Sequence, residues 1–578
     1  MESSPPRHEW RNLLLDVLLI LGLVWKATAH VASTQPLEAA DELAYLIAGY
    51  DVPVHGLPSA AGGPLYTAWY WLLSHVCHEP TRLIAFNWSI LTGLLCLSLY
   101  LLARALGGTR ASGLLAAGIA LTTALLDIWP HPMHLAASVV LLGLAGAVRW
   151  RKLPGSCLVL GLALLTASYL RPELFLAFLA FCPLSLIAVG GHTWRERRVV
   201  PALGYVCGLG LATALALHYL GNPLGGNRSI AAFGQHYAVV RVKQENLTVN
   251  PWLEWESFIR RDFGNVQSVG EAWQANPAAL KGHMSWTLRH LPEVVAATVV
   301  PHIDDSRYLK YIYMAGYAHV SAPAKGKPWF RAAWAFLALV VVMGAVGIGW
   351  HLWRPTAEAP AYGVWFAVLV VAVVSLPALL SSVLIFPRCH YLILLIALLL
   401  VLATTGLRWA PVLQRCWARL DGRVPLVLLA IVLVLVVPNR SRGWNLQTWV
   451  GFAKPKKAPD DAIARTVATA RAEAGRGPHV LLDTDRIYAA YLGPHCRLLY
   501  PEHLAPGEPF GDFVRRLGIT LVLVSPQLES HPRLREDPSF QQFVHGPHPG
   551  FRFVPVAGSP VTVAIRQSDR SSRGERAP

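Results

Sequence analysis

The feature that most constrains the fold is a series of apolar runs, each about 15 to 25 residues long. A helix of about 20 predominantly apolar residues can cross the hydrocarbon core of a bilayer. The repetition predicts an α-helical polytopic membrane bundle of about eleven spans. They fall at 13–31, 82–103, 111–128, 133–148, 155–171, 174–191, 201–220, 329–352, 362–386, 389–408 and 424–438.

Composition agrees with a membrane location. The 578 residues are 54% hydrophobic and only 15% charged, more apolar surface than a soluble protein of this size can bury. The net charge of +16 comes largely from short loops between apolar runs, which the positive-inside rule explains better than nucleic-acid binding. The lipid bilayer is therefore an expected partner, and nucleic acid is not.

The basic loops also predict an orientation. They lie at 104–110, 149–152, 195–198 and 408–423, so we expect the N-terminus in the cytoplasm and long external loops at 32–81 and 221–328. Ala27-Thr28-Ala29 also fits a signal-peptide cleavage site, but Lys26 interrupts the preceding run and the following acidic loop needs that run as its anchor.

The composition changes after residue 440, which predicts a membrane domain at 1–440 and a linker at 441–460. Helical and apolar segments alternate over 461–567, which predicts an external α/β domain. Residues 568–578 are expected to be a disordered tail. The predicted helices are 461–474 and 486–492, the predicted strands are 479–482, 551–556 and 561–566, and the segments 511–517 and 519–525 continue the alternation between them.

An acidic stretch follows the first apolar run directly. Asp41 and Glu42 lie beside the membrane, where carboxylates are costly unless they face water or do chemistry. Tyr45 is four residues after Asp41, so a helix would place both on one face. The alternative role for Asp41 is to cap this helix. A Gly/Pro loop and an aromatic segment at 64–77, which includes Tyr66, follow and predict an interfacial helix.

Basic residues at three other places suit a phosphate group. Arg171 stands in the run Tyr-Leu-Arg-Pro-Glu with Glu173, and Arg388 stands beside His390 and Tyr391. The alternatives are a structural Arg171–Glu173 pair at a helix break and a snorkelling Arg388. Near the eighth run, Arg307 and Lys310 are further candidates for lipid headgroups or a donor phosphate.

The turn with Asp127, His131 and His134 holds possible metal ligands, which Asp41 would complete. A polar turn at the membrane interface is the favoured interpretation, so no metal and no other cofactor is predicted. No Cys-x-x-Cys zinc pattern occurs among the eight cysteines. Cys77 and Cys496 both fall on the external side; a disulfide between them and two free thiols both stay open, with free thiols favoured.

The acid pair, the nearby Tyr45, the Gly/Pro gap and the following Pro-Leu-Tyr-x-x-Trp run together resemble the first external loop of the GT-C glycosyltransferases. The most similar branch holds protein O-mannosyltransferases and the lipid A aminoarabinose transferase. The resemblance covers roughly residues 10 to 440. Gly62-Gly63 stand where that loop often carries a lysine, and Cys389 and His390 separate Arg388 from Tyr391, where the family often has an Arg-Tyr pair.

The resemblance implies an inverting transfer of a sugar from a polyprenyl phosphate donor. Asp41 matches the family's base, with Glu42 as its backup or partner. Arg171 and Arg388 would bind the donor phosphate, and Glu173 would orient Arg171. The implied setting is a bacterial inner membrane with the acceptor on the periplasmic face. Whether the acceptor is protein, lipid or glycan stays open.

Two other classes of function remain. One is a transporter or flippase of a lipid-linked sugar, although broken mid-membrane helices and internal repeats are not evident. The other is a non-catalytic membrane assembly protein. In the loop at 221–328, the segments 252–263 and 277–291 are amphipathic, which predicts helices lying on the membrane. A structural cap over the bundle and a lid that contacts substrate are the two alternatives.

Overall fold

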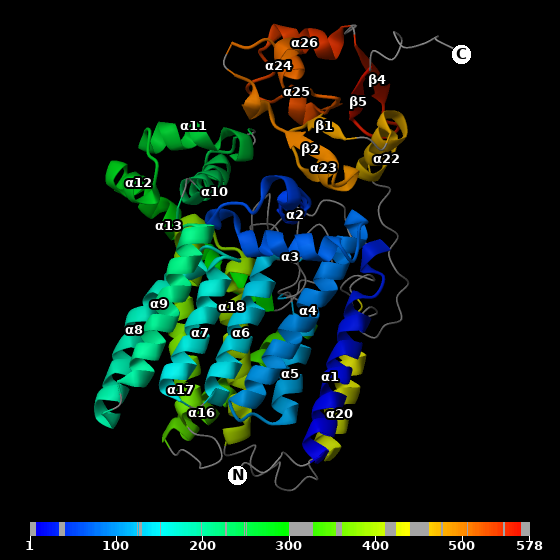
Figure 1. Ribbon diagram of the computed structural model, residues 1–578. Coiled ribbons are helices and arrows are strands. Elements are labelled where there is room, and N and C mark those ends of the chain that lie inside the picture. The colour runs from blue at the N-terminus through cyan, green and yellow to red at the C-terminus, as the bar shows by residue number, and fades with distance from the viewer. Residues whose placement is uncertain are drawn as a thin grey trace. The chain divides into compact units, whose positions relative to one another are not determined.

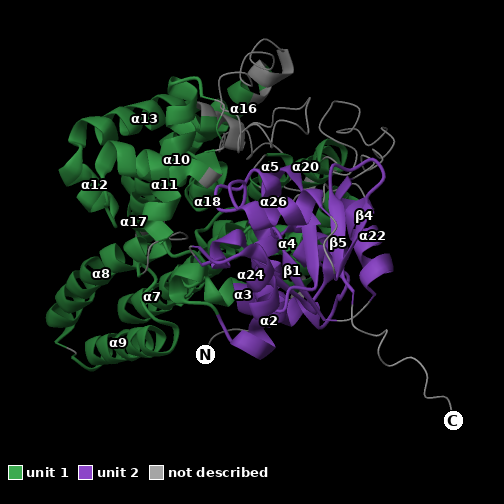
Figure 2. Ribbon diagram, turned by 90° about the horizontal axis from the view of Figure 1, so that it is seen from above, with its two compact units in different colours: residues 1–31, 58–66, 86–456 green, residues 32–57, 67–85, 457–578 purple. Residues whose placement is uncertain are grey.

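The structure is a computed structural model (Figure 1). It divides into two compact units, which are coloured separately in Figure 2. Unit 1 holds residues 1–31, 58–66 and 86–456; unit 2 holds residues 32–57, 67–85 and 457–578. The structure describes all residues except 1–6, 34–40, 124, 126–129, 151, 198, 226–227, 248, 250, 300–327, 354–360, 411–422, 438, 440–461, 476–477, 506, 547–549 and 568–578.

Unit 1 is helical, and a helix lies in each of the eleven predicted spans. Seven are long and apolar enough to cross a membrane, which makes the chain a multi-pass membrane protein. A count of eleven is not confirmed, because α5, α7 and α20 are shorter and α1 carries charged residues. The helices are α1 (Arg7–Thr28), α4 (Pro80–Ala105), α5 (Arg110–Thr122), α6 (Pro132–Trp150), α7 (Leu153–Ser168), α8 (Leu174–Glu196), α9 (Val200–Leu220), α16 (Pro328–Trp353), α17 (Ala361–Leu380), α18 (Cys389–Gly406) and α20 (Arg423–Val436).

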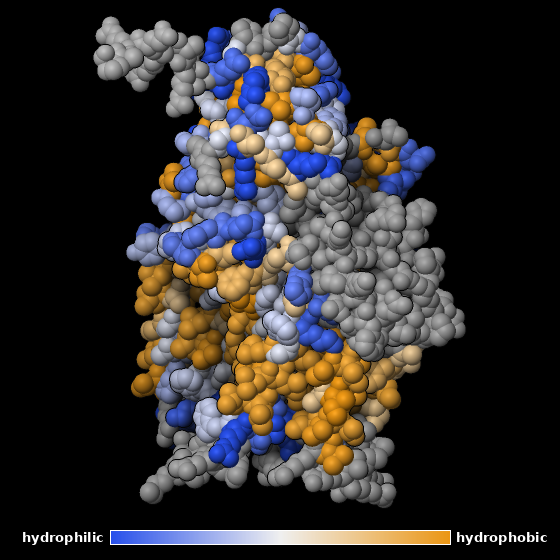
Figure 3. Space-filling model, turned by 90° about the vertical axis from the view of Figure 1, so that its right-hand side faces the viewer, coloured by the Kyte–Doolittle hydropathy of each residue, from blue (hydrophilic) through white to orange (hydrophobic). Residues whose placement is uncertain are grey.

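The outer surface of unit 1 is apolar over the length of its helices. Figure 3 views the side on which α1 and α20 lie in Figure 1, and it shows a broad hydrophobic area there. Side chains on both helices are about half exposed, such as Leu14 at 58% and Leu428 at 57%. Exposed leucines in this number are costly in water but not in lipid, so the surface fits a bilayer.

Two features hold the bundle together. At Gly344 and Gly406, an added Cβ would collide with the backbone of the opposite helix, so small residues allow α16 and α18 to approach closely. Between α1 and α5, the buried carboxylate of Asp16 pairs with Arg110 at 2.7 Å and accepts a hydrogen bond from Tyr100 at 2.6 Å. A charge within an apolar run is tolerated here because it is paired.

Four helices form a cap at one end of the bundle: α10 (Arg228–Gln244), α11 (Pro251–Phe263), α12 (Val269–Ala275) and α13 (Pro277–Val299). Their apolar faces pack on one another around Phe233, Phe258 and Leu280. The apolar residues that suggested a helix lying on the membrane at 252–263 are therefore largely satisfied by neighbouring helices, as the cap alternative predicts.

The C-terminal part of unit 2 is a mixed five-stranded sheet with helices, as the predicted α/β domain requires. Strand order is β2-β1-β3-β5-β4, parallel between β1 and its two neighbours and antiparallel elsewhere. The predicted strands are present, but β2, α25 and α26 were missed. The elements are α22 (Ala462–Ala474), β1 (His479–Leu482), α23 (Ile487–Leu492), β2 (Cys496–Leu499), α24 (Phe510–Arg516), β3 (Leu521–Val524), α25 (Pro526–Glu529), α26 (Pro538–His545), β4 (Phe551–Pro555) and β5 (Thr562–Arg566).

Unit 2 also contains α2 (Glu42–His55) and most of α3 (Pro64–Ser74). An added Cβ at Gly49 of α2 would lie 2.8 Å from Cβ of Tyr70 in α3, so glycine is needed for this close packing. Ile47 of α2 packs against the apolar cluster of the α/β domain that includes Leu481 and Val563. The acidic helix is thus part of the core of unit 2.

Candidate functional site

The two acids at the start of α2 have opposite environments. Glu42 is buried, with 1% exposed, and its carboxylate accepts a hydrogen bond from the Tyr70 hydroxyl. The Asp41 side chain is 73% exposed. It occupies the N-cap position directly before α2, as the capping alternative predicts, but its side chain makes no capping hydrogen bond. Of the pair, Asp41 is the carboxylate that an incoming substrate can reach.

Asp41 lies beside the α/β domain. Its Oδ1 atom is 3.9 Å from Nη1 of Arg486, which stands directly before α23. Nearby, burial raises the pKa of Asp483, at the carboxyl end of β1, well above its ordinary value. Sequence reasoning missed Arg486, because it lies 445 residues after Asp41 and no local pattern indicates a contact over that separation.

In unit 1, Arg171 is held at the junction between α7 and α8. Pro172 ends one helix here, and the Arg171 guanidinium, in a residue only 6% exposed, donates from Nε to Glu173 Oε1 at 2.8 Å. Its Nη1 atom faces Nε2 of His131 at 3.5 Å, and its Cζ atom is 5.8 Å from the centre of the Tyr391 ring. The predicted Arg171–Glu173 pair is present, and it is part of a larger group.

His131 links this junction to α18. Its ring stacks on that of His390, with centroids 4.4 Å apart. Burial, together with the nearby charges of Arg171, Arg388 and Arg228, holds the pKa of His131 well below its usual range, so the ring is neutral. The Met133 backbone N–H faces Nδ1 at 3.1 Å, and Nη1 of Arg171 faces Nε2 at 3.5 Å, so N–H groups approach both ring nitrogens.

Arg388 stands at the start of α18, where its Cζ atom is 5.9 Å from the centre of the Trp252 ring. Arg228, at the start of α10, donates to the carbonyl of Ala61. We call Arg171, Arg228, Arg388, His131 and His390 the arginine–histidine cluster. Among the residues that the structure describes, three cations stand here against one carboxylate, Glu173, so the cluster favours an anion. Sequence reasoning missed Arg228 and Trp252, because their positions depend on the folding of the cap.

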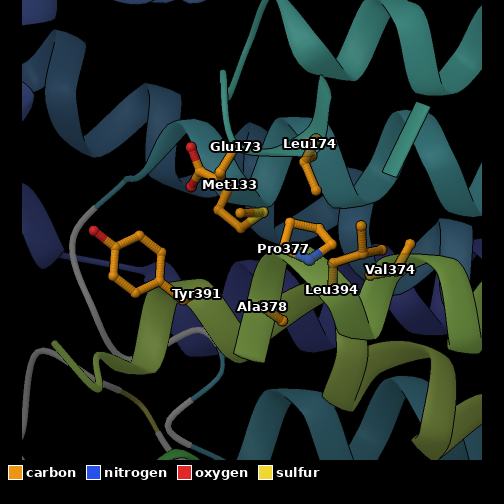
Figure 4. Close-up of a pocket in the computed structure, with 8 residues that line it drawn as sticks. All are labelled: Met133, Glu173, Leu174, Val374, Pro377, Ala378, Tyr391 and Leu394. Carbon is orange, nitrogen blue, oxygen red and sulfur yellow. The ribbon is translucent and has the colours of Figure 1, made fainter. Parts of the chain in front are cut away.

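A narrow apolar crevice, too tight in this structure to hold a water molecule, lies beside this cluster. It is lined by Met133, Glu173, Leu174, Val374, Pro377, Ala378, Tyr391 and Leu394. Figure 4 shows the Glu173 carboxylate and the Tyr391 hydroxyl pointing to the same side, with the apolar side chains of Leu174, Pro377 and Leu394 farther along. The crevice therefore has a polar end and an apolar remainder.

Other predicted site residues have different placements. Tyr45 is buried at 8% exposed, and Tyr66 is fully buried with its hydroxyl accepting from Asn87 Nδ2 at 3.0 Å. His134 is buried in α6, and its Nε2 atom contacts the Leu125 carbonyl oxygen at 2.8 Å. Asp127, Arg307 and Lys310 lie outside the described residues.

The described residues hold no group of three His, Cys, Asp or Glu side chains placed to bind a metal. His131 and His134 already use ring nitrogens in contacts with the backbone. Cys77 and Cys496, both described, are unpaired.

Comparison with known proteins gives likenesses in structure. No protein-family model and no curated protein matches the sequence. The Archaeoglobus fulgidus oligosaccharyltransferase AglB, in complex with an inhibitory peptide and a dolichol-phosphate, aligns with 96% of this chain and 75% of its own at 11% identity and a TM-score of 0.42. The same protein was also crystallised with zinc and sulfate, with a TM-score of 0.40, 11% identity, and 96% of this chain and 73% of that chain covered.

ArnT from Cupriavidus metallidurans, bound to undecaprenyl phosphate, aligns with 97% of this chain and 98% of its own, at 11% identity and a TM-score of 0.39. At these identities and TM-scores the likeness carries no argument about fold or activity.

Proposed function

We propose that this chain is a membrane glycosyltransferase that moves a sugar from a polyprenyl phosphate carrier to an acceptor. The observation that carries the proposal is the arginine–histidine cluster, which has apolar side chains of α8, α17 and α18 beside it. A polyprenyl phosphate has the same two-part chemistry, a phosphate joined to an apolar chain. The choice of this carrier rests on the sequence resemblance described above.

The cluster suits a phosphate that gains charge as it leaves. The Arg171 guanidinium is already oriented by Glu173, so it loses little freedom when it binds an oxyanion. Its Nη1 atom lies 3.5 Å from Nε2 of His131, so a phosphate oxygen that accepts from the guanidinium would also lie beside the His131 ring. Preorganised donors of this kind stabilise developing charge in a site that excludes water. Arg388 is the second proposed phosphate ligand.

Asp41 is the proposed base. Its carboxylate would take the proton of the acceptor nucleophile, which attacks the anomeric carbon as the bond from that carbon to the phosphate oxygen breaks. The phosphate leaves with the bonding electron pair, and a single displacement inverts the anomeric centre. The exposure of Asp41 supports this role, since a base must be reached by its substrate. Glu42, bonded to Tyr70, would keep α2 in place.

We further propose a bacterial inner membrane, with the N-terminus in the cytoplasm and the α/β domain in the periplasm. The basic loops named above support this orientation. The sugar and the acceptor are left undefined.

The test is a transfer assay with purified protein, membrane extract as the acceptor source, and a panel of radiolabelled polyprenyl phosphate sugars. We expect label to move to an acceptor with the wild type and transfer to fall about 10²- to 10⁴-fold in Asp41→Asn, the usual size of a general-base contribution. Asp51→Asn, on the same helix, is the matched control and should keep transfer.

Equal transfer by wild type and Asp41→Asn would assign the base to Glu42 or another group. Absence of transfer together with uptake of lipid-linked sugar into vesicles would replace the proposal with a transporter. Absence of both activities would favour the non-catalytic alternative.

A further inference from the structure

Helix α13 packs against the end of a candidate membrane span. On its inward face, His283 Nε2 contacts the carbonyl oxygen of Ile385 at 2.9 Å, and Thr287 Oγ1 donates to that of Val383 at 2.7 Å. Ile385 is the last residue of the candidate span Gly363–Ile385. This part of α13 is therefore held against the end of a helix that crosses the bilayer.

The opposite face of α13 is basic and apolar together. Successive residues of an α-helix are 100° apart, so Lys281, Ser285, Leu288 and Arg289 lie on the side away from His283 and Thr287. All four are exposed, and Leu288 is 50% exposed. With Met284 they line an open groove. We call these five residues the outward face of α13.

The two cations of this face have no carboxylate partner among the described residues. Lys281 Nζ instead lies 5.6 Å from the centre of the Trp273 ring, which is itself 42% exposed on the neighbouring α12. A tryptophan beside basic side chains is the usual composition at the boundary between lipid headgroups and water. Leu288, between the two cations, supplies apolar surface on the same side.

We propose that the outward face of α13 binds an anionic phospholipid of the bilayer. Lys281 and Arg289 contact its phosphate, and Leu288 and Trp273 contact the glycerol and upper acyl chain. Basic amphipathic helices bind such lipids through both forces, and each Lys or Arg near the surface strengthens binding about fivefold. The inference does not depend on the proposed enzymatic activity.

Such a lipid would also act on the turn that leads to Arg388. The carbonyls that α13 holds belong to the π-helical turn Ser381–Ile385, three residues before Arg388. Lipid bound on one side of α13 would press its other side against this turn. Anionic lipid should therefore stabilise the cap.

The experiment measures lipid binding to the purified full chain. Native mass spectrometry would count phosphatidylglycerol and phosphatidylcholine retained from mixed micelles, and thermal unfolding would be followed as each lipid is added. We expect wild type to retain phosphatidylglycerol preferentially and to gain thermal stability from it. The double variant Lys281→Gln/Arg289→Gln should bind it about twentyfold more weakly, from two charges at about fivefold each.

Two further variants make the result specific. Arg260→Gln removes one charge from α11, which lies farther from the spanning helices in Figure 1, and should bind as wild type does. The exchange Lys281→Arg/Arg289→Lys keeps both charges and should also bind normally, which would show that loss in the double variant is not misfolding.

The proposal is overturned if the double variant retains phosphatidylglycerol as wild type does. It is equally overturned if Arg260→Gln loses as much binding as Lys281→Gln alone, because the effect would then be one of net charge. If wild type retained phosphatidylcholine as well as phosphatidylglycerol, the face would not be specific for anionic lipid. If a protein from the same membrane displaced the lipid from wild type but not from the double variant, the face would be assigned to that protein.

Discussion

The arginine–histidine cluster and the start of α2 hold their charges in different ways. In unit 1, Arg171 is 6% exposed, has its own counter-charge in Glu173, and stands beside a neutral histidine. In unit 2, Asp41 is largely in solvent, and its partner Arg486 is 3.9 Å away. The first arrangement is fixed before any ligand binds, whereas the second leaves a carboxylate accessible.

This contrast matches what two chemical tasks require. Binding a phosphate benefits from donors that are already oriented in a dry setting, because charge-assisted hydrogen bonds are strongest there. A base must meet a nucleophile that arrives from water, so it cannot be sealed among side chains. Four measurements can break or sharpen this comparison.

The largest effect is expected at Arg171. Arg171→Gln removes the guanidinium that Glu173 orients, and it leaves the Glu173 carboxylate without its cation. Such a change commonly costs 2–5 kcal/mol in a buried pair. We expect the KM for the lipid-linked donor to rise about a hundredfold. Arg171→Lys should recover only part of this, because an ammonium lacks the planar fork. A donor KM unchanged in Arg171→Gln would remove Arg171 from the phosphate site.

The second measurement concerns pH and the cap. Burial lowers the pKa of His283 to about 4, from an ordinary value near 6.5. The folded state therefore takes up a proton less readily than the unfolded state, and stability falls as pH drops from 6.5 towards 4. The loss should reach about 3 kcal/mol, at about 1.4 kcal/mol for each pH unit.

The comparison for this pH effect is His283→Gln, which keeps an amide donor for the Ile385 carbonyl and removes the titration. Thermal unfolding across this pH range should show a flatter profile for His283→Gln than for wild type. His192→Gln, at a half-exposed position on α8 outside the cap, should follow wild type. Parallel profiles for wild type and His283→Gln would show that another group controls the acid response.

The third measurement separates the two acids. Glu42→Gln keeps an acceptor for the Tyr70 hydroxyl, so we expect transfer to fall less than tenfold and stability to change by about 1 kcal/mol. Tyr70→Phe should produce a similar change. If Glu42→Gln instead abolished transfer while the protein stayed folded, the roles given to Asp41 and Glu42 would have to be exchanged.

The smallest effect is expected at Arg486. Exposed ion pairs contribute about 0.2–1 kcal/mol, so Arg486→Ala should lower turnover at most about fivefold. Arg486→Lys should restore turnover. High salt should lower the turnover of wild type towards that of Arg486→Ala, since salt screens exposed charges. If wild-type turnover does not depend on salt, and Arg486→Ala turns over as fast as wild type, then this contact does not orient Asp41.

Local patterns predicted much of the fold. Apolar runs placed a helix in each expected span, and alternation of helix and strand located most of the α/β domain. Strand β2 was missed because Cys496–Leu499 mixes one charged residue with three apolar ones and is too short to show a period. Helix α26 was missed because its two buried residues, Phe540 and Phe543, give little signal in eight positions.

The candidate site was predictable only in part. Arg171 and Glu173 could be paired from sequence because they are two residues apart. The stacking of His131 on His390 and the approach of Asp41 to Arg486 join positions hundreds of residues apart, and only tertiary packing brings them together. Their roles stay predictions until the variants are measured.

The makeup of unit 2 has a consequence for how the protein is made. Helix α2 ends at His55, and the strand β1 of its packing partner begins about 420 residues later. At about 5–20 residues per second, roughly 20 to 80 seconds of synthesis separate the two. Helix α2 is therefore synthesised before nearly all of the bundle is inserted, and it can pack on the α/β domain only after that. A chain that terminates early would have every spanning helix and an α2 that never acquires its partner.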